Sequence, residues 1–260
     1  MSPDSLAERI RNESQQLKER EPTLARPLQL RIDGDDGMAG LLSRVLAAEL
    51  ARPDFDWCEL VKLFQSVYAG SSGLTDATTS DIEATLRRDP ASDSALTVVL
   101  HQKGFHALAT HRLAHALWLT GRVELARWLQ GTSTRYFGVD IHPACSIGPG
   151  AMFDHGTGIV IGETSVIGTG VSILQAVTLG GTGNHRGDRH PKIGDGVLIG
   201  AGAILLGNIT IGNHARIGAG SVVLRDVPAH MTVVGVPARS VVRDARSTPA
   251  ESMDHNLLEP

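Results

Sequence analysis

An aliphatic residue recurs at every sixth position in the second half of the chain. The unbroken series is Ile193, Ile199, Leu205, Ile211, Ile217 and Val223. Glycine follows four of these six residues, and a small or branched residue stands two positions before each new repeat. A period of six fits neither an α-helix nor a hairpin sheet, but it is typical of the hexapeptide repeat of a parallel β-helix. Three hexapeptides form one triangular coil, the aliphatic residues point inward, and coils stack roughly 4.7–4.9 Å apart.

The same period begins earlier, but its frame changes. Ile141, Ile147, Phe153 and Ile159 fit one frame, whereas Ile161, Ile167, Ile173 and Leu179 fit a frame shifted by two positions. The sequence leaves the origin of this shift open. The polar, basic segment 183–192 interrupts the repeat and cannot lie inside a prism, so we expect it to protrude as a loop, where function often concentrates.

Residues 1–138 have helical rather than hexapeptide periodicity. Apolar residues recur three and four positions apart, as in Leu41, Leu42, Val45, Leu46 and Leu50. We therefore expect an α+β protein in two parts, with an all-helical domain over 1–138 and a parallel β-helix domain over 139–242. The polar tail over 243–260 is expected to be flexible.

Composition excludes several classes of protein. The formal charge of −4 gives no sign of nucleic-acid binding. No run of about 18 apolar residues predicts a membrane span, and the polar start of the chain does not form a signal peptide. The two cysteines form no zinc or redox motif, and we expect both to stay reduced in the cytoplasm.

His155 is the first candidate for chemistry. It stands at a corner of the repeat, and Asp140 precedes it by slightly less than one coil of three hexapeptides, which places this carboxylate close to the same corner one coil away. A carboxylate that fixes and stabilises an imidazole produces a base suited to deprotonating an alcohol. The alternative is a simple hydrogen bond at a corner.

Two further polar groups and a glycine run stand out. Arg189 and His190 lie in the predicted loop, where a guanidinium could bind a carboxylate through two hydrogen bonds, or form only an exposed basic surface. Asp154 could pair with an ammonium group or cap a corner. The run Gly-Gly-Thr-Gly at 180–183 is weak as a nucleotide motif and better suits the close approach of a long, thin ligand to the backbone.

Several motifs together resemble serine acetyltransferase, a family of the hexapeptide-repeat acyltransferases. The most specific are Asp-His-Gly-Thr-Gly at 154–158 and Gly-Asp-Arg-His-Pro at 187–191, and Asp-Ile-His-Pro at 140–143 agrees with them. The helical half resembles the family at 21–22, 88–91, 103–105 and 111–112, so the resemblance extends from about residue 5 to 242. Gly-Val-Pro-Ala-Arg at 235–239 is shared by many hexapeptide acyltransferases and adds less.

The resemblance implies a fold, a reaction and a set of site residues. It implies a left-handed β-helix and transfer of acetyl from acetyl-CoA, a co-substrate rather than a bound cofactor, to L-serine. His155 is then the general base and Asp140 its partner, with no metal and no covalent intermediate on the interior Cys145. Asp89 and Asp154 would face the serine ammonium, and Arg189 and His190 its carboxylate. The expected acetyl-CoA groove is formed by Gly180, Ala201, Arg216 and Ala219.

The resemblance also implies partners. The chains would form a trimer through 139–242, the catalytic domain, or a dimer of trimers joined through 1–138, the oligomerisation domain, with sites between subunits. Cysteine is implied as feedback inhibitor, and cysteine synthase as a partner bound through the tail. Members often end in isoleucine, whereas this sequence ends Asn-Leu-Leu-Glu-Pro at 256–260.

Three alternatives stay open from the residues alone. One is an acetyltransferase acting on a sugar or amino sugar, one is a γ-type carbonic anhydrase that uses histidine-bound zinc, and one is a non-catalytic regulator of cysteine synthase.

Overall fold

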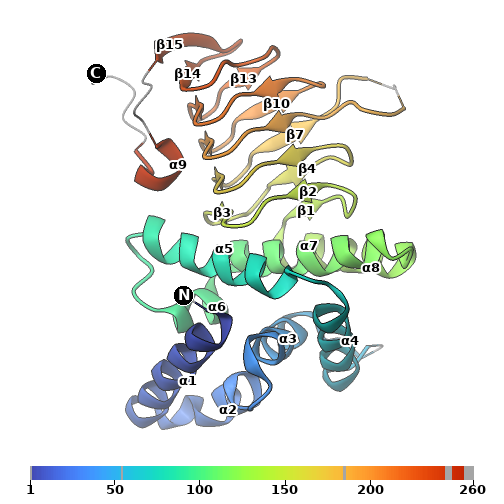
Figure 1. Cartoon of the computed structure of the whole chain (residues 1–260), viewed down its shortest axis with the longest axis vertical. Helices are drawn as coiled ribbons and strands as arrows, with labels where there is room; N and C mark the ends of the chain where they lie inside the picture. The colour runs from blue at the N-terminus through green and yellow to red at the C-terminus, as the bar shows by residue number, and fades with distance from the viewer. Residues whose placement is uncertain (1, 54, 184–185, 244–247, 255–260) are drawn as a thin grey trace.

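The computed structural model describes residues 2–53, 55–183, 186–243 and 248–254, and its helical part confirms the expected first half (Figure 1). Capping residues set several helix starts: Ser2, Asp56 and Ser94 each accept a hydrogen bond from a backbone amide of the first turn. The helices are α1 (Pro3–Arg20), α2 (Ala25–Ile32), α3 (Gly37–Leu50), α4 (Trp57–Gly70), α5 (Leu74–Arg88), α6 (Ala95–His101), α7 (Lys103–Leu119) and α8 (Val123–Phe137).

Short parallel strands then form the three faces of a left-handed β-helix. The five-stranded sheet contains β1 (Asp140–Ile141), β4 (Val160–Ile161), β7 (Thr178–Gly180), β10 (Ile204–Leu206) and β13 (Val222–Val223). The four-stranded sheet contains β2 (Ser146–Ile147), β5 (Val166–Ile167), β8 (Lys192–Ile193) and β11 (Thr210–Ile211). The six-stranded sheet contains β3 (Met152–Phe153), β6 (Ser172–Ile173), β9 (Leu198–Ile199), β12 (Arg216–Ile217), β14 (Met231–Val234) and the antiparallel β15 (Arg239–Arg243).

The strand register explains the shift in the repeat. Ile141 pairs with Ile161, and Ile161 pairs in turn with Leu179. The second of these steps along the chain equals three hexapeptides, the length of a regular coil, whereas the first step is longer by two positions. The first coil therefore holds two extra residues, and they lie in the turn between β3 and β4. This enlarged turn carries the Asp-His-Gly-Thr-Gly motif.

The predicted loop leaves the prism between β7 and β8, as Figure 1 shows. Its insertion does not disturb the stacking, because Leu179 pairs with Leu205 and Ile167 with Ile193 on either side of it. Residues 184–185 of this segment lie outside the described residues.

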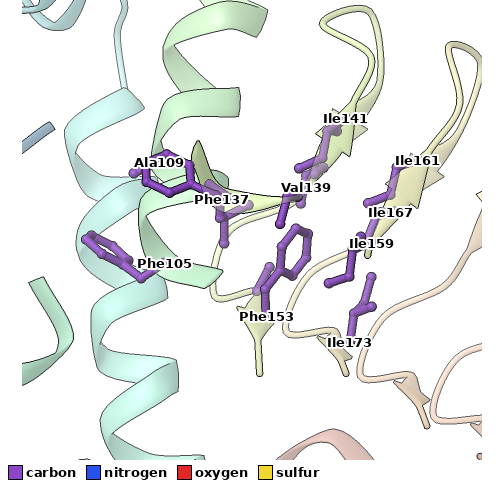
Figure 2. Packing of buried hydrophobic residues seen from close by; sticks show 14 of the residues in the cluster. Phe105, Ala109, Phe137, Val139, Ile141, Phe153, Ile159, Ile161, Ile167 and Ile173 are labelled. Carbon is purple, nitrogen blue, oxygen red and sulfur yellow. The ribbon is translucent and has the colours of Figure 1, made fainter. Parts of the chain in front are cut away.

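The apolar core runs without a break from the helices into the prism. Figure 2 shows Phe105 and Phe137 of the helical half on one side of this cluster and Phe153 and Ile159 of the first coil on the other. Fully burying one such side chain contributes roughly 1.5–3 kcal/mol. The first coil, which carries the enlarged turn, is therefore packed directly on the helices.

A buried ion pair joins the two parts beside this core. Arg112 of α7 donates to both carboxylate oxygens of Asp81 of α5, at 2.5 and 2.8 Å. The same guanidinium donates to the carbonyls of Ile147 and Gly148, and Asp81 accepts from the Ala151 amide. The pair therefore fixes the first coil on α5 and α7.

The described residues 248–254 of the tail pack against α5 and the β-helix, and the flexibility expected of the tail stays a prediction. The short helix α9 (Pro249–Ser252) buries Ala250, whose carbonyl accepts a hydrogen bond from Ser172. Glu251 pairs with the buried Arg88 of α5. Residues 244–247 and 255–260 of the tail lie outside the described residues, and the domain limits at 138 and 242 stay a prediction.

Candidate active site

His155 lies in the enlarged turn after β3, where both its backbone and its side chain are unusual. Its φ of 57° is rare for a residue other than glycine, and its side chain is 73% exposed. Its Nε2 lies 3.8 Å from Oδ1 of Asp154. An exposed imidazole on a rigid corner is available to a substrate.

The helical half supports this turn at close range. Gly104 of α7 approaches Phe153 so closely that a Cβ on Gly104 would lie 2.0 Å from the Phe153 carbonyl oxygen. Lys103 contacts the hydroxyl of Thr157 on the other side of the turn. The position of His155 is thus determined by helix α7 as well as by the β-helix.

The Asp140 side chain bonds a residue of the helical half rather than His155. Asp140 begins β1 and pairs in register with Val160, the residue to which the His155 turn leads. Its Oδ1 accepts a hydrogen bond of 2.7 Å from Nε2 of Gln130 on α8. Among the described residues, no hydrogen bond joins Asp140 to His155, so the bond expected between them is not formed in this structure.

Asp89 and Asp154 line the same pocket of about 530 Å³, together with Glu251 of the tail. Asp89 ends α5 before Pro90, as the Asp-Pro turn predicts. Its carboxylate accepts from the Ala91 amide, the Ser92 hydroxyl and the Gln102 amide, which fixes its orientation. Arg87 and Arg88 also line this pocket and pair with Glu251, which leaves Asp89 and Asp154 as the carboxylates that could face a cationic ligand.

Arg189 and His190 are held at the base of the protruding loop. Arg189 donates to Glu163 at 2.7 Å, and this hydrogen bond lowers the pKa of the Glu163 carboxyl. The His190 ring is buried, and its Nδ1 accepts from the amide of Thr164 at 3.2 Å. Burial, together with the nearby Arg189 charge, lowers the pKa of His190, so its neutral form is favoured.

These groups lie on two different edges of the prism. The histidine edge consists of turns 154–159, 174–177, 200–203 and 218–221, between the six- and five-stranded sheets. The loop edge consists of turns 142–145, 162–165, 181–191 and 207–209, between the five- and four-stranded sheets. His155 and Asp154 are on the histidine edge, and Arg189 and His190 are on the loop edge. One chain therefore does not bring the two groups together.

The residues expected to bind acetyl-CoA are also divided. Ala201 and Ala219 stack on the histidine edge, where the Gly220 amide donates to the Ala201 carbonyl. Gly180 is the last residue of β7 and lies beside the loop edge, where the protruding loop begins. Arg216 lies on β12, 3.6 Å from the Asp254 carboxylate.

Cys145 is buried, as its position in the repeat predicted, and burial raises the pKa of its thiol to about 12. A thiol in this state is a poor nucleophile. Within the described ranges, no three His, Cys, Asp or Glu side chains are grouped so that they could hold a metal ion. No helix in the same ranges is long and apolar enough to cross a membrane.

Three residues of this region were missed by reasoning from the sequence. Glu163 accepts a hydrogen bond from Arg189, and Gln130 donates one to Asp140. Glu251 lines the pocket that contains Asp89 and Asp154. Glu163 is one coil beyond Pro143 on the loop edge, so the repeat could have indicated it once the frame was known. Gln130 and Glu251 come from outside the repeat, and no periodic signal points to them.

Comparisons with known proteins find matches to both the helical half and the hexapeptide repeats. The family model described as "Serine acetyltransferase, N-terminal" matches residues 6–110, and hexapeptide-repeat models match 145–175 and 190–225. The serine acetyltransferase of Haemophilus influenzae is 48% identical over 249 residues, which is 96% of this chain and 93% of that protein.

Two solved structures have the same fold over nearly the whole chain. A serine acetyltransferase in complex with cysteine has a TM-score of 0.95 at 47% identity, covering 98% of this chain and 99% of that one. The soybean serine acetyltransferase complexed with serine has a TM-score of 0.89 at 48% identity, covering 92% and 98%. With this identity over nearly its full length, the chain belongs to the serine acetyltransferase family.

Proposed function

We propose that His155 is the general base of this serine O-acetyltransferase and that Asp140 is its partner. Membership of the family makes the overall reaction the transfer of acetyl from acetyl-CoA to the hydroxyl of L-serine. The observation that carries the assignment is the enlarged turn, which holds an exposed imidazole at a strained corner, with its Nε2 3.8 Å from the Asp154 carboxylate. Asp140 begins β1, which pairs with the strand that follows this turn.

The reaction moves one proton in two transfers, from the serine hydroxyl to His155 and then to sulfur, and replaces a C–S bond by a C–O bond. His155 takes the proton of the serine hydroxyl as its oxygen attacks the thioester carbonyl, and a C–O bond forms. The tetrahedral intermediate then releases the thiolate of CoA, breaking the C–S bond, and the imidazolium returns its proton to the sulfur. In this scheme the Asp140 carboxylate stabilises the imidazolium while it carries that proton.

Serine has an ammonium and a carboxylate, and the two edges of the prism offer groups for each. Asp89 and Asp154 suit the ammonium, whereas Arg189 suits the carboxylate through two parallel hydrogen bonds. His190, kept neutral, can still donate one hydrogen bond. Because these groups lie on different edges of one chain, we expect the loop edge of a neighbouring subunit to face the histidine edge, with the chains forming a trimer or a dimer of trimers.

Acetyl-CoA would then lie along the β-helices between subunits. The small side chains of Ala201 and Ala219 would let it lie close to the histidine edge. Gly180 and Arg216 would add contacts from the adjoining faces. Cysteine has the same ammonium and carboxylate as serine, so we expect it to compete for the serine pocket as a feedback inhibitor. A cytoplasmic location and binding of cysteine synthase through the tail remain further proposals.

Two substitutions at matched corners test the proposed base. His155→Asn keeps a residue that tolerates positive φ but cannot accept the proton. His214→Asn changes a histidine with a φ of 56° at another corner, outside the proposed site. With acetyl-CoA and serine, release of free thiol should fall by at least ~10²-fold in the first variant and stay unchanged in the second. Near-normal turnover in His155→Asn would exclude His155 as the base.

The acceptor is tested in the same assay. Serine, a panel of other amino acids, a sugar and an amino sugar are each offered with acetyl-CoA to the wild-type protein. We expect thiol release with serine, inhibited competitively by cysteine. Preference for a sugar or amino sugar would contradict the assignment of the Asp89 and Arg189 groups to an amino acid.

A further inference from the structure

A small polar cavity lies where the helical half meets the first coil. It measures about 10 Å³ and lies between α7, α8 and β1. Its lining residues are Thr110, His111, Ala114, Gln130, Ser133 and Ile141. The cavity is therefore one residue away from Asp140, which precedes Ile141 in β1.

Two side chains of this cavity carry buried polar atoms that have no protein partner. The hydroxyl of Thr110 and the Nδ1 of His111 make no hydrogen bond within the described residues, and the two residues are only 1% and 4% exposed. Leaving one such atom unsatisfied typically costs about 1–3 kcal/mol. Two unsatisfied atoms lining the same cavity point to a ligand that both can bond.

The size and chemistry of the cavity fit one water molecule. A single water occupies roughly 10–15 Å³ on this measure and needs two to four polar partners. Thr110 and His111 supply two, and Gln130 and Ser133 also line the space. The His111 ring has one N–H and one acceptor nitrogen when neutral, and water can complement either at Nδ1.

Gln130 connects this cavity to the proposed site. It lines the cavity, and its Nε2 donates to Oδ1 of Asp140 at 2.7 Å. An amide that donates to a carboxylate forms a charge-assisted hydrogen bond, which is stronger than a neutral one and directional. The rotation of the Asp140 carboxylate is therefore coupled to that of the Gln130 amide.

We propose that the cavity binds one structural water bonded to Thr110 and His111, and that Gln130, packed against it, is a positioning residue that orients Asp140. The positioning role rests on the proposed function, because it acts through the partnership of Asp140 with His155. The water site stands independently of that function, since it depends only on the cavity and its polar lining.

A double-mutant cycle tests the positioning role. Gln130→Met keeps the length of the side chain and removes its hydrogen bonds, and Asp140→Asn removes the group through which it would act. We expect Gln130→Met to lower kcat for serine acetylation at least tenfold, with the KM for serine within twofold of wild type. In the Asp140→Asn background, the same substitution should cause no further loss. Losses that multiply, or an unchanged kcat in Gln130→Met, would overturn the role.

A matched control uses a second hydrogen bond from a helical glutamine to an aspartate. Gln65 donates to Asp36 at 2.9 Å, away from the site. Gln65→Met should therefore leave kcat unchanged. A loss of kcat equal to that of Gln130→Met would mean that the effect is general destabilisation and would overturn the inference.

The water is tested by a crystal structure of the wild-type protein at a resolution that shows ordered solvent. Density for a water within hydrogen-bonding distance of Thr110 Oγ1 and His111 Nδ1 supports the site, and a dry cavity overturns it. If the wild-type protein did not acetylate serine, the proposed function would fail, yet this structure would still decide the water site and the Gln130–Asp140 bond.

Discussion

The approach of Gly104 to the His155 turn gives a quantitative prediction about activity. Gly104 is the second residue of α7, and a Cβ there would lie 2.0 Å from the Phe153 carbonyl oxygen. Real Cβ atoms essentially never come closer than 3.0 Å, so Gly104→Ala must move α7 and Phe153 apart until that limit is met. Phe153 directly precedes the Asp154–His155 pair, which would move with it.

Opposing contributions set the expected stability of Gly104→Ala. Alanine is favoured over glycine in a helix by about 0.8–1.0 kcal/mol. Overpacking against a backbone atom in a well-packed core costs about 1–3 kcal/mol. The net loss should therefore be about 1 kcal/mol, which lowers Tm by roughly 2–4 °C in a chain of this size. A displacement of about 1 Å at reacting groups can cost about 10² in rate, so kcat should fall far more than stability.

Gly131→Ala is the matched control. Gly131 lies inside α8, and a Cβ there would meet only the flexible end of Arg135, at 3.7 Å. It should keep kcat and raise Tm slightly, through helix propensity alone. Activity is measured by thiol release from acetyl-CoA and stability by thermal denaturation. The argument is refuted if Gly104→Ala retains kcat within twofold of wild type.

Three further predictions follow from buried and paired groups. Asp81→Asn leaves Arg112 buried without its charge partner and should cost about 3–5 kcal/mol in the free energy of unfolding, measured with urea; a loss below about 1 kcal/mol contradicts it. Burial, and next the nearby His115, lowers the pKa of His111 well below its usual value of 6.5, so the unfolded state binds more protons below that pH. Stability should therefore fall as pH drops below about 6.5, less steeply in His111→Asn, and equal slopes in thermal melts would refute this. Arg189→Lys loses the bidentate geometry and should raise the KM for serine about tenfold, while an unchanged KM would remove Arg189 from the site.

Much of the fold was predictable because the β-helix repeats one local rule. Each inward position needs an aliphatic residue and each coil stacks on its neighbour, so the period in the sequence is the period of the structure. The inward residues Ile193, Ile199, Leu205, Ile211 and Ile217 are all buried, as predicted. The site was less predictable, because its partners come from segments with different periods. Asp140 was identified by spacing along the repeat, but Gln130, which holds it, lies on a helix whose placement no spacing reveals.

The sequence by itself determined the two-part architecture, the interior of the prism, the protruding loop and the family motifs, because these depend on residues close together or at a fixed period. Only the tertiary structure decided where the frame shifts, since two extra residues in one turn become visible through the pairing of Ile141 with Ile161. It also decided that His155 and Arg189 occupy different edges and that α7 fixes the turn. These facts depend on which segments meet in space, and that is set by packing between distant parts of the chain rather than by any local pattern.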